Sequence, residues 1–98
     1  MTIIPDNPWI QGLPGPRLRQ VIDEKGAALM ERHHTTDVFF AVWLEVLDRA
    51  VQRRVHVRYD DLEDWGYRDA YDDGMSPKEA AVEMLAAAGW DFENVEYL

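Results

Sequence analysis

The sequence predicts a single, mainly α domain: a compact arrangement of three or four helices preceded by an extended N-terminal arm. Three observations lead to this fold class. Apolar residues recur at helical spacing in residues 16–31 and 37–54. A helix-start signature surrounds Ser76. A chain of 98 residues, 47% hydrophobic and 30% charged, has the size and composition of one globular domain. We expect residues 1–15 to form the arm and residues 16–98 the helical core.

The arm is predicted from its prolines and glycines, which are typical of irregular chain. These are Pro5, Pro8, Gly12, Pro14 and Gly15. Trp9 and Ile10 are expected to anchor the arm by packing on the core. The first predicted helix follows over Pro16–Glu31, because Pro16 suits a first helical turn and the apolar residues recur every three or four positions. Gly26 weakens this helix by up to about 1 kcal/mol.

The second predicted helix, residues 37–54, has the broadest apolar face and is therefore expected to be central and covered on more than one side. Residues 33–36 (HHTT) break the preceding pattern, and Thr35 or Thr36 is expected to cap the new helix. The apolar face consists of Val38, Phe39, Val42, Trp43, Val46, Leu47, Ala50 and Val51. The polar remainder consists of Glu45, Asp48, Arg49, Gln52 and Arg53.

Two short segments alternate apolar and polar residues in the manner of strands. Val55–Tyr59 (VHVRY) is one, and the C-terminal ENVEYL, residues 93–98, is the other. The two would pair as a small two-stranded β ribbon. The pattern is equally compatible with residues 55–59 continuing or leaving the second helix.

The last predicted helix begins at Ser76, which has the capping-box spacing Ser-x-x-Glu to Glu79 and is followed by Pro77 at the first helical position. Alanines and Leu85 favour the helix, and Gly89 is a typical stop.

Between these helices, residues 61–73 combine acids and aromatics without a clean apolar stripe. They predict either a short helix held by Leu62 and Trp65 or two turns broken at Gly66. In both cases most of the carboxylates must face water, because burying an unpaired carboxylate costs several kcal/mol.

The charge of the chain is concentrated in its C-terminal part. The net charge is −9; residues 1–58 carry eight bases and seven acids, whereas residues 59–98 carry two bases and twelve acids. This distribution opposes direct binding of nucleic acid or of an anionic membrane and favours a basic protein surface as the partner. The basic cluster Arg49, Arg53, Arg54 and Arg58 is expected to pair with the chain's own acids, Asp60–Asp64 among them, or with a second subunit.

A docking face for that partner is predicted where aromatics and acids coincide, since Trp and Tyr are enriched at interface hot spots and carboxylates pair with arginine. The predicted partner-binding residues are Asp60, Asp61, Glu63, Asp64, Trp65, Tyr67, Asp69, Tyr71, Asp72 and Asp73. If the carboxylates form a row, they would imitate the phosphates of DNA. The alternative is a solvated acidic helix whose aromatics belong to the core.

Catalysis, cofactors and metal binding are not expected. The chain has no cysteine, no Gly-rich phosphate loop and no nucleophile elbow around Ser76. His33, His34 and His56 lack a recognised metal-ligand spacing. Residues 61–72 only partly match a calcium loop. No basic N-terminal region and no run of about 20 apolar residues is present, so we expect a cytoplasmic protein that neither enters nor spans a membrane.

Residues 65–81 (WGYRDAYDDGMSPKEAA) resemble segments of small proteins of phages and mobile elements. The resemblance implies an inhibitor of host or defence machinery, of the anti-CRISPR or DNA-mimic kind, with a nucleic-acid-handling protein as the target. The alternative is a structural or adaptor module that self-associates, as a homodimer for instance. It would use the apolar face of the second helix and the C-terminal aromatics Trp90, Phe92 and Tyr97.

Overall fold

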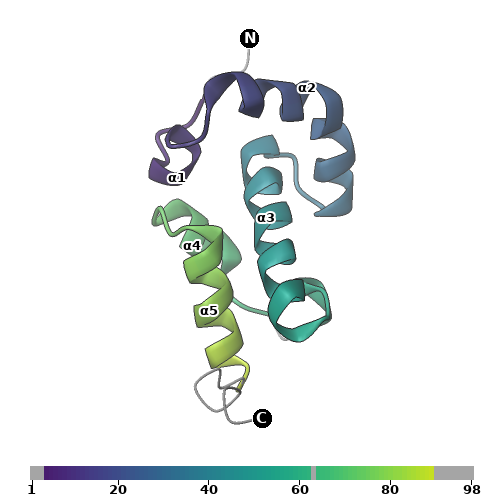
Figure 1. Cartoon of the computed structure of the whole chain (residues 1–98), viewed down its shortest axis with the longest axis vertical. Helices are drawn as coiled ribbons and strands as arrows, with labels where there is room; N and C mark the ends of the chain where they lie inside the picture. Colours follow the sequence, from purple (N-terminus) through teal and green to yellow (C-terminus); the bar gives the residue numbers. More distant parts are fainter. Residues whose placement is uncertain (1–3, 63, 90–98) are drawn as a thin grey trace.

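The computed structural model describes residues 4–62 and 64–89, which form a helical fold built around one central helix (Figure 1). Within these residues there are five α-helices, one 3-10 turn and no strand. In chain order they are α1 (Pro8–Gln11), α2 (Gly15–Arg32), α3 (Val38–Val55), η1 (Tyr59–Asp61), α4 (Tyr67–Asp72) and α5 (Pro77–Ala87). The prediction of a mainly α fold is confirmed.

α3 is the central helix, as its apolar face predicts. α2 packs on one side of it and α5 on the other, while η1 and α4 also contact it (Figure 1). Trp43, Leu47 and Val51 of α3 have no exposed surface. Burial of each such side chain stabilises the fold by about 1.5–3 kcal/mol, so α3 supplies much of the hydrophobic core.

The N-terminal arm is less extended than predicted, because residues 8–11 form α1. Asn7 explains the difference: its Oδ1 accepts hydrogen bonds from the backbone N–H groups of Trp9, at 3.0 Å, and Ile10, at 3.1 Å. This cap, followed by Pro8 at the first helical position, satisfies the start of a single helical turn. Ile10 is only 1% exposed and Trp9 packs against the core, so the expected anchoring is confirmed.

The connection from α2 to α3 differs from the prediction in its cap. Asp37, not Thr35 or Thr36, caps α3, and its Oδ1 accepts from the N–H groups of Phe39 and Phe40 at 3.1 and 3.2 Å. Thr35 instead accepts from the Asp37 N–H at 3.1 Å. Gly26 is buried where the two helices meet, and a Cβ there would lie 3.1 Å from Cγ2 of Val38. The glycine therefore permits the close approach of α2 to α3.

The predicted strand over residues 55–59 is wrong, and the alternative, that this segment leaves the helix, is correct. α3 continues to Val55, and His56 ends it in the left-handed conformation, with φ of 61°. Val57 is exposed and Tyr59 is buried at the start of η1, so the alternating apolar residues do not share one buried face as they would in a strand. The segment that was predicted to pair with it, residues 93–98, lies outside the described residues.

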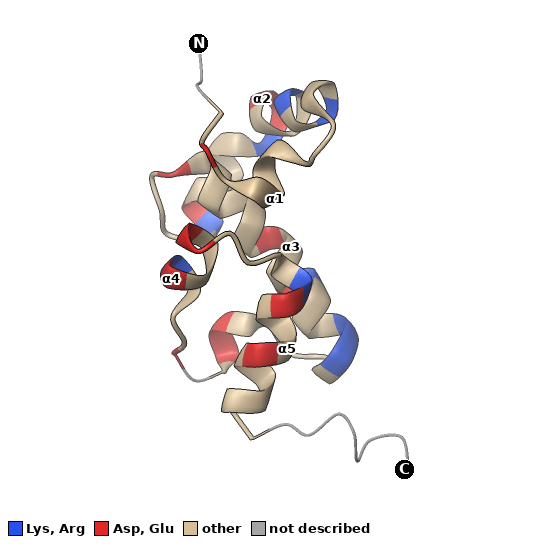
Figure 2. Ribbon diagram, turned by 90° about the vertical axis from the view of Figure 1, so that its left-hand side faces the viewer, with Lys and Arg blue, Asp and Glu red and all other residues tan. Residues whose placement is uncertain are grey.

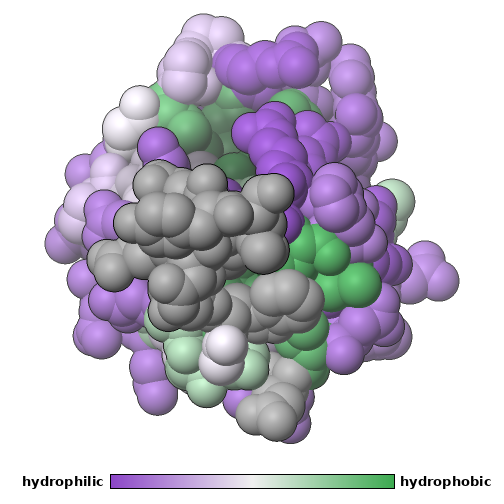
Figure 3. Space-filling model, turned by 60° about the horizontal axis from the view of Figure 1, so that its bottom comes forward, coloured by the Kyte–Doolittle hydropathy of each residue, from purple (hydrophilic) through white to green (hydrophobic). Residues whose placement is uncertain are grey.

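α5 follows its sequence signals closely. Ser76 Oγ accepts from the Glu79 N–H at 3.2 Å, and Gly89 follows the helix with a φ of +92°. Across the described residues, no helix is both long and apolar enough to cross a membrane. Apolar side chains do reach the surface, and Figure 3 shows several on the lower face of the molecule.

Candidate functional site

The residues predicted to bind a partner lie in one segment, residues 60–73, which we call the acidic segment. It contains the end of η1, an irregular stretch at residues 64–66, and α4. Of the two predicted alternatives, two turns broken near Gly66 is therefore confirmed, and one short continuous helix is wrong. Glu63 lies outside the described residues.

The backbone of the acidic segment is held against the core by its aromatic residues. Tyr67 donates a hydrogen bond from its hydroxyl to the Tyr59 carbonyl at 3.3 Å, and the carbonyl of Tyr71 accepts from Asn7 Nδ2 at 2.7 Å. The Tyr71 ring packs edge-on against Trp43, with ring centroids 6.0 Å apart. These contacts fix the two helical turns to α3 and to the N-terminal region.

The aromatic residues therefore serve mainly as core. Tyr71 is 4% exposed, so its predicted role as a direct contact residue is wrong. Trp65 and Tyr67 are half-buried and pack against the core and against each other, with ring centroids 5.7 Å apart. The sequence analysis left open whether these aromatics belong to the core or contact a partner. Packing against the core, which for Tyr67 includes the ring of Tyr59, explains why most of their surface is covered.

The acids of the same segment face solvent. All six that the structure describes are exposed: Asp60, Asp61, Asp64, Asp69, Asp72 and Asp73. Figure 2 shows acidic residues on the ribbon of α4 and also on α5. Two of the six take part in ion pairs: Arg58 Nε lies 3.4 Å from Asp60, and Arg68 Nε lies 3.2 Å from Asp72. The expected pairing of the basic cluster with Asp60–Asp64 is thus observed for Arg58.

Arg68 is the basic residue within the acidic segment, and it is occupied by internal contacts. Its guanidinium pairs with Asp72 and with Asp37, the latter at 3.1 Å, and lies over the rings of Phe40 and Tyr71 at 5.0 and 5.3 Å. Partial burial by itself lowers the pKa of Arg68, but the two carboxylates outweigh it and raise the pKa. Arg68 therefore joins α4 to the start of α3 and neutralises one acid of the segment.

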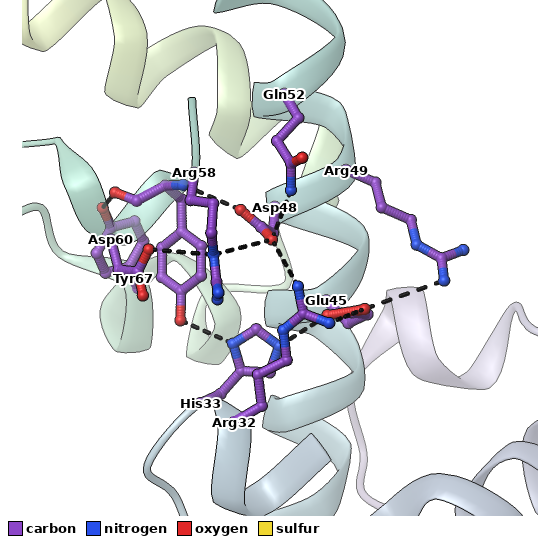
Figure 4. Close-up of polar contacts among 10 residues, drawn as sticks. Arg32, His33, Glu45, Asp48, Arg49, Gln52, Arg58, Asp60 and Tyr67 are labelled. Carbon is purple, nitrogen blue, oxygen red and sulfur yellow. Dashed lines mark hydrogen bonds and ion pairs between the residues drawn. The ribbon is translucent and has the colours of Figure 1, made fainter. Parts of the chain in front are cut away.

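Behind the acidic segment lies a buried polar cluster centred on Asp48 (Figure 4). Asp48 is 1% exposed and accepts from the Tyr59 N–H at 3.0 Å and from Gln52 Nε2 at 2.8 Å. Arg32 and Arg58 approach Asp48 Oδ2 at 3.6 and 3.7 Å. A buried carboxylate is tolerated only when such partners replace water.

A second branch of the cluster joins three side chains. His33 Nδ1 lies 2.8 Å from the Tyr59 hydroxyl, and His33 Nε2 lies 3.0 Å from Oε1 of Glu45 (Figure 4). An imidazole protonated on Nε2 satisfies all three groups, because Tyr59 then donates to Nδ1 and the ring donates to Glu45. Together, the two branches connect the end of α2, the polar side of α3 and η1.

The order carboxylate, imidazole, hydroxyl is one that hydrolases use to activate a nucleophile. Here the hydroxyl belongs to a buried tyrosine, and burial, followed by the nearby carboxylates of Asp60 and Asp48, raises the pKa of Tyr59 to about 12. A hydroxyl that holds its proton this strongly is a poor nucleophile at neutral pH. The geometry therefore favours a structural role for the cluster.

The histidines occupy local structural positions. His33 ends α2 and is buried in the cluster, while His34 and His56 have positive φ angles of 54° and 61° in the turns after α2 and α3. Among residues 4–62 and 64–89, no group of three histidine or acidic residues is arranged to hold a metal ion.

The sequence did not predict this cluster. Glu45 and Asp48 were placed on the polar face of the second helix, which would ordinarily be solvated. The signal that could have found Asp48 is its position inside the most apolar helix, one residue after Leu47 and three before Val51. An acid there requires buried partners, and Tyr59 and Arg58 supply them from beyond the helix.

The chain is similar to one described protein family and to proteins of two mycobacteriophages. Residues 39–87 match the model of a family described as a family of unknown function, DUF5419. The chain is also similar to the "Gene 87 protein" of Mycobacterium phage L5, with 45% identity over 42 residues, which is 43% of this chain and 79% of that protein. It is similar to the "Gene 87 protein" of Mycobacterium phage D29, with 43% identity over 47 residues, covering 48% of this chain and 87% of that protein.

No solved structure matches the chain. The family match spans nearly all of α3 together with the acidic segment and α5, and it leaves α2 outside. The resemblance to small phage proteins inferred from residues 65–81 is confirmed by these relatives.

Proposed function

The chain belongs to the family of unknown function DUF5419, and from this premise we propose that it acts without catalysis, by binding and inhibiting a basic protein that handles nucleic acid. Its relatives are mycobacteriophage proteins, which supports a role in a phage. A phage protein that blocks host or defence machinery, as an anti-CRISPR protein does, fits this proposal.

The observation that carries the proposal is the combination of exposed acids with a fixed backbone. The six exposed acids project from a segment whose aromatic residues are packed against the core. Ordering this surface on binding therefore costs little conformational entropy, which favours affinity. Four of the acids (Asp61, Asp64, Asp69 and Asp73) form no ion pair with other described residues, so their charge is available to a partner.

The chemistry of the acids favours a basic, arginine-rich partner. Carboxylates bind arginine through charge-assisted hydrogen bonds, and clustered negative charge increases the rate of encounter with a basic surface. Proteins that handle nucleic acid present an extended basic surface of this kind, because they neutralise phosphates with lysine and arginine. More specifically, we propose that these carboxylates imitate the phosphates of DNA.

The self-associating alternative has little of its first surface available. Most of the apolar face of α3 is covered by α2, α4 and α5, with Trp43, Leu47 and Val51 fully buried and Val46 39% exposed. The C-terminal aromatics Trp90, Phe92 and Tyr97 lie outside the described residues.

The proposal is tested by capture of binding proteins from the lysate of a phage-susceptible bacterium at low and high salt, with identification by mass spectrometry. The test variant is Asp64→Asn/Asp69→Asn/Asp73→Asn, which removes three acids that form no ion pair with described residues. Asp72 is left intact, because its loss would also break the pair with Arg68.

The matched control, Asp23→Asn/Glu24→Gln/Glu31→Gln, removes three exposed acids from α2 and changes the net charge equally. We expect a nucleic-acid-binding protein to be captured by the wild type and the control, to be lost with salt, and to be lost in the test variant. Equal capture by both variants, or capture of no such protein, would exclude the acidic segment as the binding surface.

A further inference from the structure

A groove on the other side of α3 has the opposite charge to the rest of the molecule. It runs between α2 and α3, has a volume of about 410 Å³, and is lined by residues of both helices. Its charged residues are Arg17, Lys25, Arg32, Glu45 and Arg49. Four bases and one acid line this groove in a chain whose net charge is −9.

The charge of the groove is only partly neutralised within the chain. Arg32 and Arg49 approach Glu45 at 3.5 and 4.0 Å, and their side chains remain 44% and 66% exposed. Arg17 and Lys25 form no ion pair with the residues that the structure describes, and both are exposed. The groove therefore has two cations available for an acidic ligand and two more that are half-exposed.

The floor of the groove is apolar. Val21, Ala28, Leu29, Val42 and Val46 contribute to it, and Val46 is 39% exposed, which is unusual for an α3 residue of this size. A smaller hollow of about 90 Å³ continues the floor toward the N-terminal end of α2, where Leu13, Pro14 and Leu18 line it. An apolar floor with a basic rim suits a segment that carries both apolar residues and acids.

Apart from the acidic segment, whose aromatic residues are packed against the core, the chain contains a further segment of that composition. Residues 90–98 (WDFENVEYL) have three acids, no base, and five large apolar or aromatic residues. We propose that the α2–α3 groove binds residues 90–98 of a second copy of this chain, with Asp91, Glu93 and Glu96 paired to the basic rim.

The dimensions agree with this assignment. Arg17 and Arg32 are 15 residues apart on α2, which corresponds to about 22 Å of helix. Asp91 and Glu96 are five residues apart, or about 17 Å in an extended chain, and the nine residues together reach about 30 Å. The three acids therefore fit within the length of the basic rim.

The length of the segment favours a second copy over the same chain. α5 ends at the opposite end of the molecule from the start of α2 (Figure 1), and the molecule is 49 Å long. Nine residues reach at most about 30 Å. A segment that starts at the end of α5 must use part of this reach to get to the groove of its own chain, which leaves less of it to lie along the basic rim, whereas a segment from a second copy is free of this constraint. Reciprocal exchange between two copies would occupy both grooves and close the assembly as a symmetric dimer.

The first test uses the full-length chain and a fluorescently labelled peptide of residues 90–98. We expect the peptide to bind and binding to weaken with salt. It should also weaken by roughly tenfold in Arg17→Gln/Lys25→Gln, since two partly exposed ion pairs are lost. The matched control Arg19→Gln/Arg53→Gln removes two exposed bases outside the groove and should bind as the wild type does.

The second test measures the mass of the full-length chain by analytical ultracentrifugation over a range of concentrations. Lys25→Glu and Glu93→Lys should each weaken dimer formation, and mixing the two variants should restore it, because each then offers the other a matching segment or groove. Circular dichroism of each variant checks that the helices are retained.

Three results would overturn the proposal. The first is a peptide that does not bind, or binds Arg17→Gln/Lys25→Gln as tightly as the control. The second is a chain that stays monomeric at every concentration, which would indicate that the segment does not join two copies. The third is a mixture of Lys25→Glu and Glu93→Lys that associates no better than either variant alone.

Discussion

His33 Nδ1 and the Tyr59 hydroxyl lie 2.8 Å apart, and this hydrogen bond joins the end of α2 to the residue that precedes the acidic segment. Both side chains are buried, and the ring of Tyr59 also packs edge-on against Tyr67 at a centroid distance of 5.3 Å. The position of the first acids on the surface therefore depends on a polar contact made inside the molecule.

Tyr59→Phe tests this dependence, because it keeps the ring and removes only the hydroxyl. The buried Nδ1 of His33 then loses its partner, and we expect the free energy of unfolding to fall by about 1–3 kcal/mol. Urea denaturation followed by circular dichroism measures the change. Tyr67→Phe is the control: its hydroxyl donates a longer bond of 3.3 Å from a half-buried ring, so its loss should cost less. An equal or larger loss in Tyr67→Phe would show that the contact with His33 contributes little.

Asp48→Asn tests the charge at the centre of the buried cluster. Asparagine can still accept the Tyr59 N–H, but it removes the negative charge that faces Arg32 and Arg58, and its amide nitrogen replaces the oxygen that accepts from Gln52 Nε2. Both arginines are more than a third exposed, so water compensates in part and we expect a loss of about 1–3 kcal/mol rather than the larger cost of a fully buried pair. The control Asp23→Asn, at an exposed position of α2, should change the stability by no more than about 0.5 kcal/mol. A neutral result for Asp48→Asn would mean that the bond from the Tyr59 N–H, and not the charge or the bond from Gln52, holds η1 in place.

The three tyrosines around the acidic segment make stability depend on alkaline pH. Burial, followed by nearby carboxylates, raises the pKa of Tyr59 and of Tyr67 to about 12, and burial followed by Asp37 raises that of Tyr71 to about 12. The ordinary value of 10.0 applies to the unfolded chain, so between pH 10 and 12 the unfolded state loses these protons while the folded state keeps them. The contribution of these tyrosines to the free energy of unfolding is therefore fully present below pH 10 and is lost as the pH rises toward 12.

This pH dependence is measured by the ultraviolet absorption of phenolate and by chemical denaturation at each pH. We expect three of the four tyrosines to ionise at a clearly higher pH in the folded chain than in denaturant. In Tyr71→Phe, only two tyrosines should show this raised pKa. Ionisation of all four tyrosines near pH 10 in the folded chain would contradict the burial that the structure shows.

The sequence predicted those helices whose signals are local. Ser76, Pro77 and Glu79 determine the start of α5 through contacts within four residues, and the structure reproduces them. The apolar face of α3 likewise determined its central position. The prediction of a strand over Val55–Tyr59 was wrong, because alternation over five residues is too short to distinguish a strand from the end of a helix. Here the helix ends at Val55, and His56 terminates it.

The candidate site was predicted less completely, for a physical reason. Exposure of the carboxylates follows from the cost of burying them, so their position on the surface could be inferred from the sequence. Whether Tyr71 faces a partner or the core depends on Trp43 and Asn7, which are 28 and 64 residues away along the chain. The α2–α3 groove likewise depends on two helices packing together, which no local pattern contains.

Asn7 offers the sharpest test of how the N-terminal region holds the acidic segment. Its Oδ1 caps α1, while its Nδ2 donates to the Tyr71 carbonyl at 2.7 Å. Asn7→Asp preserves the cap, since aspartate is as good an N-cap as asparagine, but it replaces the donor with a carboxylate oxygen that faces a carbonyl. We expect the free energy of unfolding to fall by about 1–3 kcal/mol, because both oxygens are buried without a proton between them.

Asn7→Ala should cost more than Asn7→Asp, since it removes the cap as well, which contributes about 1 kcal/mol. Asp6→Asn, at the exposed neighbouring position, is the control for a change of charge in this turn. If Asn7→Asp is as stable as the wild type while Asn7→Ala is not, the cap alone accounts for the role of Asn7. The acidic segment would then depend on Tyr59, and not on the N-terminal region, for its position on α3.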